Sequence, residues 1–219
     1  MNTVEGFYIT LGKTTSTAEV DDVKWRLVSL DGISRYDFSS DDNFEARYLS
    51  DAVFVQDTVV GSNVNIDANT YNYYDSAMRN GTTSRAALKD GSYFSLSSID
   101  TSFVKERKIK QIDFWKYSSE TESYEIDNSV AKLENEDNST DKFWLLDIGE
   151  IQTFFKNTDE SRQFGARNDN GYAEGYWLRT PPCGGGTGKA HLCVSGSGFV
   201  FSYYYALASY KVRAAFQLA

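Results

Sequence analysis

Cysteine, proline and histidine are scarce in this chain of 219 residues, which has two cysteines, two prolines and one histidine. Two cysteines are too few for a disulfide framework in a chain of this length, and nothing else completes the four ligands of a structural zinc site. A catalytic triad or a histidine-based metal site would need more histidine than His191 alone. All five residues lie between Pro181 and Cys193, so their scarcity elsewhere marks out one short segment.

Acidic residues are absent from the C-terminal end of the chain. No Asp or Glu follows Glu174, so residues 175–219 carry a formal charge of +4 while the first 174 residues carry −13, within a total of −9. An acidic balance of this size argues against nucleic acid or an anionic membrane as the main partner. We therefore expect no nucleic acid and no membrane insertion, and we leave the oligomeric state open.

Other motifs that would identify a function are missing as well. No apolar run approaches the ~20 residues of a membrane-spanning helix, and the first twenty residues lack the pattern of a signal peptide. Gly184–Lys189 matches neither a phosphate loop nor a dinucleotide fingerprint. Asp41–Glu45 and Glu134–Asn138 offer oxygen ligands for calcium without the spacing of an EF-hand, so we interpret both as solvated acidic faces. The sequence predicts no metal and no cofactor, and no pair of carboxylates is singled out for glycoside hydrolysis.

Alternating apolar and polar residues predict strands along much of the chain. The expected strands cover 6–12, 23–30, 52–55, 58–60, 113–117, 142–146, 175–179, 190–195, 199–205 and 211–218. Gly196 and Gly198 predict a tight turn between the strands that flank them. The acidic stretch 118–142 is expected to be an exposed excursion.

Short helices are expected in the first two thirds of the chain. Ser76 is a suitable N-cap for a helix over 77–79, and another helical piece is expected over 84–89. Residues 98–110 are expected to form one more short helix or a transition from helix to strand.

The pair Asp147 and Glu150 predicts a capping box at the start of a further helix. The spacing of Ile148, Ile151 and Phe155 places them on one face of that helix, which is typical of core packing. The simplest interpretation is one α+β domain over residues 1–219, with short helices and a mostly antiparallel β C-terminal third.

The segment Phe199–Tyr210 is dominated by Tyr, Phe, Ser and Ala. Tyrosine supplies rigid amphipathic contact area and serine supplies adaptable hydrogen bonds, so this composition is typical of adaptable binding surfaces. An ordinary pair of aromatic-rich strands packed in a core explains the composition equally well. The composition alone does not decide between the two.

A series of motifs runs through the chain in a fixed order: Tyr8–Gly12, Val23–Val28, Tyr74–Arg79, Phe143–Leu146, Tyr176–Pro181, Gly198–Val200 and Val212–Phe216. The series resembles an uncharacterised domain family of Gram-positive gut bacteria and their phages, which is similar to the C-type-lectin-like fold of formylglycine-generating enzymes. The most specific part is Trp177–Pro181 followed about thirty residues later by Val212 and Arg213. Ala214 stands where the family usually has proline, a departure that leaves the fold assignment intact.

The same architecture is used by the variable proteins of diversity-generating retroelements, in which adenine-directed mutagenesis rewrites a C-terminal segment. Randomised Asn codons give Tyr, Phe, Ser, Cys, Gly, Ala, His, Thr or Pro, but never Glu, Gln, Met or Trp. Residues 180–210 contain none of the four excluded types. The resemblance implies that this segment is variable and that it lies in a fixed frame, namely Trp177, Leu178, Arg179, Val194, Gly198, Val200, Val212 and Arg213.

The resemblance also implies roles for individual residues. Cys183 and Cys193 would be sampled residues and not the redox pair of a formylglycine-generating enzyme, so we expect no enzymatic activity. Trp177 would be a core residue, and Arg179 would form hydrogen bonds within the fold. We expect an extracellular, cell-surface or virion location.

The leading hypothesis is a ligand-binding protein that displays a diversified surface to another macromolecule, a protein in the first instance. Its expected contact residues are His191, Cys193, Ser195, Ser197, Phe199, Phe201, Ser202, Tyr203, Tyr204, Tyr205, Ser209 and Tyr210. A carbohydrate-binding surface module is the second hypothesis, because aromatic faces also stack on sugars. An enzyme of the formylglycine-generating type is the third.

Overall fold

The computed structural model describes ten stretches of the chain, residues 8–15, 20–30, 33–34, 52–57, 88–108, 115–126, 140–155, 174–180, 191–203 and 210–219. Antiparallel strands make up most of their regular structure, with one short α-helix that the structure describes from end to end. The fold is therefore β-rich and of the α+β type, which confirms the expected class at this coarse level.

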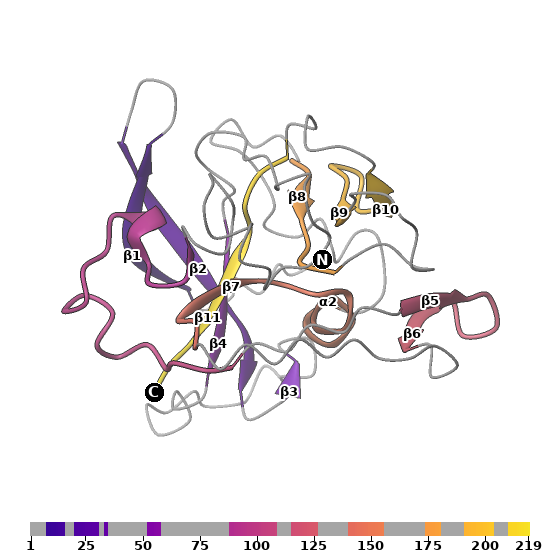
Figure 1. Cartoon of the computed structure of the whole chain (residues 1–219), viewed down its shortest axis with the longest axis horizontal. Coiled ribbons are helices and arrows are strands. Elements are labelled where there is room, and N and C mark those ends of the chain that lie inside the picture. The colour runs from indigo at the N-terminus through magenta and orange to yellow at the C-terminus, as the bar shows by residue number, and fades with distance from the viewer. Residues whose placement is uncertain are drawn as a thin grey trace, which may run out of the picture.

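The largest sheet has six strands and is built from both ends of the chain (Figure 1). Its order is β1-β2-β4-β11-β7, and the short β3 pairs with β2 outside this path. The strands are β1 (Tyr8–Thr15), β2 (Val20–Leu30), β3 (Ile33–Ser34), β4 (Val53–Gln56), β7 (Phe143–Leu145) and β11 (Ala214–Gln217). Because β11 lies between β4 and β7, the C-terminal strand is held on both edges by hydrogen bonds from strands far away in sequence.

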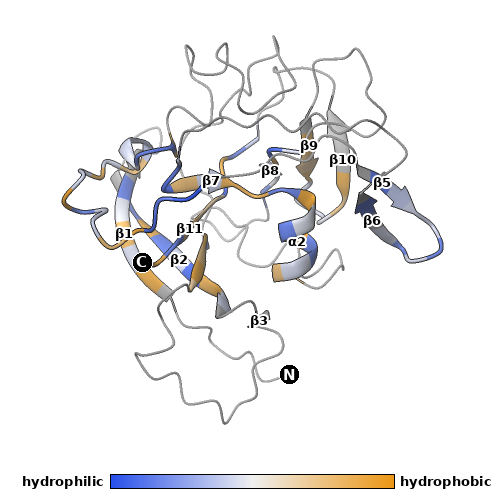
Figure 2. Cartoon of the chain, turned by 60° about the horizontal axis from the view of Figure 1, so that its bottom comes forward, coloured by the Kyte–Doolittle hydropathy of each residue, from blue (hydrophilic) through white to orange (hydrophobic). Residues whose placement is uncertain are grey.

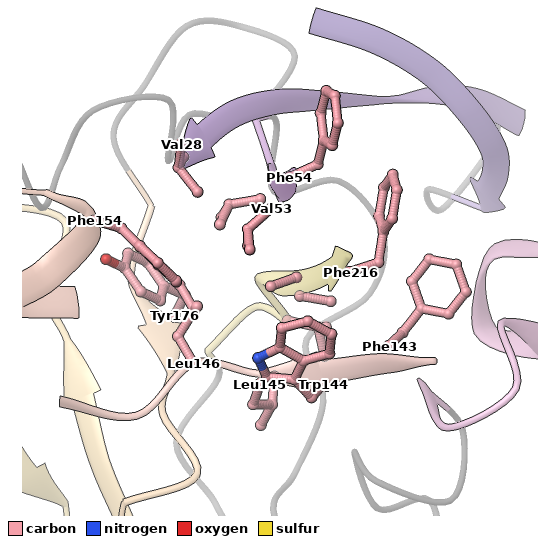
Figure 3. Close-up of a cluster of buried hydrophobic side chains, with 14 of the residues drawn as sticks. Val28, Val53, Phe54, Phe143, Trp144, Leu145, Leu146, Phe154, Tyr176 and Phe216 are labelled. Carbon is pink, nitrogen blue, oxygen red and sulfur yellow. The ribbon is translucent and has the colours of Figure 1, made fainter. Parts of the chain in front are cut away.

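An aromatic cluster fills the core beside this sheet. The Phe216 ring stacks on Phe54 at 5.3 Å between centroids and lies 5.5 Å from Phe143, an arrangement visible in Figure 3. Trp25 meets the edges of Phe94 and Phe216 at 4.9 and 5.0 Å. All five side chains are fully buried, and edge-to-face contacts of this kind add stability beyond the burial of apolar area.

Two smaller sheets lie at the end of the molecule away from β1 (Figures 1 and 2). One has the order β10-β9-β8, with β8 (Tyr176–Trp177), β9 (His191–Val194) and β10 (Val200–Tyr203). The other is a hairpin of β5 (Trp115–Ser118) and β6 (Ser123–Ile126). The first of these sheets contains the described part of the segment that we expect to be variable.

The helix α2 (Ile148–Phe154) begins where the sequence predicts it. The Asp147 carboxylate accepts a hydrogen bond from the Glu150 amide at 2.7 Å, and the Glu150 carboxylate accepts one from the Asp147 amide at 3.1 Å. The capping box is therefore confirmed. Ile148, Ile151 and Phe155 are all fully buried, so the expected apolar face is confirmed too.

One expectation about local structure is wrong within the described residues. Residues 98–108 form turns followed by isolated bridges at Val104 and Arg107, with no α-helix. From Val104 on, tertiary hydrogen bonds such as the one from the Lys105 amide to the Gln217 carbonyl hold the chain against the end of β11. The acidic stretch 118–142, expected to be an exposed excursion, is exposed at residues 119–122 and continues into the strand β6.

The structure also describes a 3-10 helix, η4 (Ser92–Phe94), which carries Phe94 into the aromatic cluster. The helix expected over 77–79 and the strand expected over 58–60 lie outside the described residues, as do residues 84–87 of the helix expected over 84–89; of that helix the structure describes Leu88 as helical and Lys89 as a turn. No helix in the described part of the chain is long and apolar enough to cross a membrane.

Candidate functional site

The hairpin of β9 and β10 carries the described part of the expected contact surface. Its antiparallel register pairs Val200 with Val194, Phe201 with Cys193, Ser202 with Leu192 and Tyr203 with His191. Residues from two expected contact segments are thereby brought onto neighbouring strands. The hairpin thus joins the His191–Ser197 group to the Phe199–Tyr203 group.

The tip of this hairpin is a hydrogen-bonded turn over residues 195–199. The Ser195 amide donates to the Phe199 carbonyl at 2.8 Å, and the Gly198 amide donates to the Ser195 carbonyl at 2.9 Å. Gly198 has a φ of +87°, a conformation that costs glycine little and other residues more. The expected turn is confirmed, and Gly198 has a conformational reason to be glycine.

The side chains at the tip differ in their exposure. Phe199 has 61% of its surface accessible to solvent, which is unusual for a phenylalanine, and Ser197 is exposed as well. Ser195 is half-buried, and its hydroxyl accepts hydrogen bonds from the amides of Ser197 and Phe199 at 3.2 and 3.1 Å. Phe199 and Ser197 are therefore available to a partner, whereas Ser195 faces the backbone of its own turn.

Cys193 is placed differently from what the sequence led us to expect. Its side chain is 0% exposed, and Leu192 and Val194 beside it are buried too. Successive side chains of a strand point to opposite faces of its sheet, so both faces of β9 are covered here. The apolar character of this strand is visible in Figure 2. A macromolecular ligand cannot reach a side chain in this position, so we leave Cys193 out of the proposed surface.

The buried position also affects the chemistry of the thiol. Burial raises the pKa of Cys193 to about 12, so it stays protonated at physiological pH. The thiolate is the nucleophile and the metal ligand in cysteine chemistry. Cys193 is consequently poorly suited to the role that the third hypothesis, a formylglycine-generating type of enzyme, would require of it.

The frame around the hairpin is buried. Trp177 and Leu178 lie in the core, and the Tyr210 ring meets Trp177 edge-on at 5.1 Å. A Cβ atom added to Gly175 would lie 2.5 Å from the Tyr210 ring, so this tyrosine packs directly on the glycine backbone. The expected core role of Trp177 is confirmed. Tyr210, an expected contact residue, is half-buried and belongs in part to the frame.

Backbone hydrogen bonds join the chain on either side of residues 180–210, which we call the tail segment. The Trp177 amide donates to the Lys211 carbonyl, and the Lys211 amide donates to the Gly175 carbonyl, both at 3.1 Å. We call this contact the 175–211 clamp. Directly after β8, the Leu178 amide donates a hydrogen bond to the Leu192 carbonyl at 2.9 Å. The clamp is therefore continuous with the three-stranded sheet.

Arg179 connects the tail to the start of α2. Its guanidinium contacts the carboxylates of Asp147 and Glu150 at 2.5 Å each and donates to the Leu145 carbonyl at 2.6 Å. The arginine is almost fully buried, so its charge needs these partners. The expected role of Arg179 in hydrogen bonding within the fold is confirmed. Both carboxylates are also the capping-box residues of α2.

Asp147 titrates as part of this cluster. Burial is the largest influence on its carboxyl group and raises its pKa, while the Arg179 guanidinium acts in the opposite direction. Thr180 adds a further link, because its hydroxyl accepts a hydrogen bond from the Ile148 amide at 2.9 Å. Together these contacts fix the end of β8 to the N-terminus of α2.

A second arginine, which follows the tail segment, is buried as well. The Arg213 guanidinium lies over the rings of Phe155 and Tyr176 at 4.8 and 4.9 Å, and its Nε donates to the Gln56 carbonyl at 3.0 Å. Two of the four positive charges in residues 175–219 are thus inside the fold. The charge of +4 is therefore a property of the composition of residues 175–219 and does not by itself indicate a basic surface.

Further exposed apolar side chains lie outside the tail. Tyr117 in β5 is 56% exposed, and Ile99 and Phe103 protrude from the turns before Val104. Sequence reasoning did not select them. The signal for Tyr117 was a single aromatic residue next to an acidic stretch, which does not separate an exposed aromatic side chain from a buried one.

The remaining expected contact residues are described by their backbone alone or lie outside the described residues. The side chains of His191, Phe201, Ser202 and Tyr203 lie outside the described part of the structure, as do the whole of Tyr204, Tyr205 and Ser209. Cys183 and both acidic stretches considered for calcium lie outside it too. Among the residues that the structure describes, no group of three or more His, Cys, Asp or Glu side chains is arranged to hold a metal ion.

Comparisons with protein-family models, with curated proteins and with solved structures find no match to this chain.

Proposed function

We propose that this protein is a ligand-binding protein with a C-type-lectin-like fold that displays a diversified surface, formed by residues 180–210, to a macromolecular target. The target class is protein, and the setting is a bacterial or phage surface. The proposal rests on the resemblance of the motifs and on the composition of the tail. The structure supports it through the way in which that tail is held.

The observation that carries the proposal is a division between frame and tip. Seven of the eight frame residues are buried, and Val200 is half-buried; the seven are Trp177, Leu178, Arg179, Val194, Gly198, Val212 and Arg213. In contrast, Ser197 and Phe199 at the tip are exposed. A surface that changes its residues without unfolding needs this division, because substitutions at exposed positions usually change stability by about 0.5 kcal/mol or less.

The larger sheet supports the proposal in a second way. The strand β11, which leaves the tail, lies inside the six-stranded sheet and contributes Phe216 to the aromatic core. The tail is therefore attached at both ends to well-packed structure, through Arg179 before it and β11 after it. A rigid attachment of this kind lowers the entropic cost of presenting a binding surface.

A carbohydrate-binding module remains the second candidate, and the exposed Phe199 ring is the observation that favours it. Aromatic faces stack on sugar rings as readily as they fill protein pockets. A glycan array separates the two candidates, since strong and selective binding to one glycan class would favour the carbohydrate module.

A triple replacement of Tyr203, Tyr204 and Tyr205 by serine tests the proposed surface. If these residues form a binding surface, the melting temperature stays within a few degrees of the wild-type value. A large fall would show that they are core residues and would contradict the proposal. The triple replacement of Phe54, Phe143 and Phe216 by serine is the matched control, and it should prevent folding because all three are buried.

The DNA around the gene tests the diversification itself. The proposal requires a nearby reverse-transcriptase gene and a near-copy of the 3′ end of this gene that differs only at template adenines. A locus without either would remove the diversification claim and leave a binding protein of fixed specificity.

A further inference from the structure

Ser195 has a different place in the turn from the other expected contact residues. Its hydroxyl accepts two hydrogen bonds, from the amides of Ser197 and Phe199, at 3.2 and 3.1 Å. Its backbone forms two more bonds across the same turn, with Phe199 and Gly198. The two backbone bonds are open to other residues at position 195, whereas the two hydroxyl bonds need a short acceptor there, so part of the shape of the tip depends on the side chain of residue 195.

The two amides would otherwise face water at an exposed tip. A serine or threonine hydroxyl in this position replaces water as the acceptor and holds the chain in one conformation. This hydrogen bond fixes the backbone of Phe199, because the Phe199 amide is one of the two donors. The phenyl ring, 61% exposed, is thereby carried by a fixed backbone and does not depend on a packed side chain for its position.

We propose that Ser195 is a positioning residue of the binding surface, which sets the conformation of the tip and so the direction in which Phe199 is presented. This inference rests on the proposed function. It divides the positions at the tip into two kinds: residues 197 and 199 change the chemistry that a partner meets, whereas residue 195 changes the shape of the backbone that carries them.

A variable position 195 would then have a distinct effect on specificity. Of the residue types that adenine randomisation supplies there, serine and threonine keep a short hydroxyl acceptor, whereas Ala, Gly, Phe and Tyr do not place one next to the two amides. Replacement at this one position would select between a fixed tip and a rearranged one. A protein target shaped to fit one tip would discriminate against the other, even though residue 195 never touches it.

Amide hydrogen exchange in the full-length chain, followed by NMR, tests the proposal without any ligand. In Ser195→Ala, exchange at the amides of residues 197 and 199 should accelerate about three- to tenfold, the range expected when one modest hydrogen bond is lost. The melting temperature should stay within about 1 °C of wild type, because the tip contributes little to the core. Ser195→Thr should restore slow exchange, because it restores the hydroxyl.

Ser197→Ala is the matched control. Ser197 is exposed, and none of the hydrogen bonds among the described residues uses its hydroxyl, so its removal should leave exchange at residue 199 unchanged. Equal exchange at the Phe199 amide in Ser195→Ala and Ser197→Ala would overturn the proposal, as would a Ser195→Thr variant that exchanges as fast as Ser195→Ala. Because no partner is involved, these outcomes are independent of the locus test. A gene without a template copy removes the diversified function and leaves the role of Ser195 in the turn to be decided by exchange.

Discussion

The strand β9 and the turn that follows it are adjacent in the chain and opposite in their environment. Cys193 in β9 is fully buried, whereas Phe199, six residues later, has 61% of its surface exposed. Both belong to the stretch that composition marks as unusual. The composition therefore locates the segment, but the burial of each residue in the fold decides which side chains of that segment can contact a partner.

The largest expected difference between the two regions is chemical. In a Cys183→Ser background, Cys193 should react with iodoacetamide at pH 8 more than about a thousandfold more slowly than a cysteine placed at the tip by Ser197→Cys. The buried thiol has a pKa of about 12, and only the thiolate reacts. Mass spectrometry of timed samples measures both rates. Rates within tenfold of each other would mean that β9 is accessible.

A pair of aromatic replacements extends the comparison to stability. Trp177→Ala should lower the free energy of unfolding by about 3–5 kcal/mol, because it leaves a cavity in the core. Phe199→Ala should change it by about 0.5 kcal/mol or less, since an exposed ring leaves no cavity. Urea denaturation followed by circular dichroism measures both. A loss above about 2 kcal/mol in Phe199→Ala would place this ring in a packed site and not at a binding surface.

Two ion pairs sharpen the comparison between buried and exposed charge. Arg179→Met should cost about 3 kcal/mol or more, because it leaves the carboxylates of Asp147 and Glu150 without their buried partner. Lys13→Met removes a pair with Asp22 at 3.8 Å, both side chains of which are more than half exposed, and should cost less than about 1 kcal/mol. Thermal melts at low and high salt check both values. Equal costs would show that the Arg179 cluster is not a structural connection.

The smallest effect is expected at an exposed turn outside the tail. Hydrogen bonds from the Ser97 hydroxyl and amide lower the pKa of Asp100 below its ordinary value of 3.8. A lowered pKa in the folded state means that the ionised carboxylate stabilises the fold at neutral pH. This contribution is lost as the pH falls through the pKa of the folded protein. Asp100→Asn should therefore lower the melting temperature slightly at pH 7 and leave it unchanged at pH 2, as thermal melts at both values would show.

Local patterns in the sequence predicted local structure well. The capping box at Asp147 and Glu150 involves residues three apart, and the turn at Gly198 depends on the conformation of one glycine, so both can be recognised without knowledge of the fold. The partners of these residues could not be predicted in the same way. Arg179 contacts Asp147, which lies 32 positions earlier in the sequence, and no pattern in either segment predicts that the two side chains are partners.

The errors have a common physical origin in tertiary contacts. Residues 98–108 have a helix-compatible composition, but residues 98–103 form turns, and bridges at Val104 and Arg107 pair the rest with Leu218 and Asp141. The expected surface position of Cys193 was wrong for a similar reason, since other parts of the fold cover both faces of β9 and the sequence of one strand does not show this.

The 175–211 clamp means that the tail segment enters and leaves the fold at a single point. Its two ends are tied to each other by hydrogen bonds before the chain continues into β11. The entropic cost of closing a loop grows only slowly with the length of the loop. Because the two ends are joined to each other, this cost is associated with the clamp and not with the pairing of β11. The register of β11 between β4 and β7 is thus set by its own partners, independently of the number of residues between the two ends of the clamp.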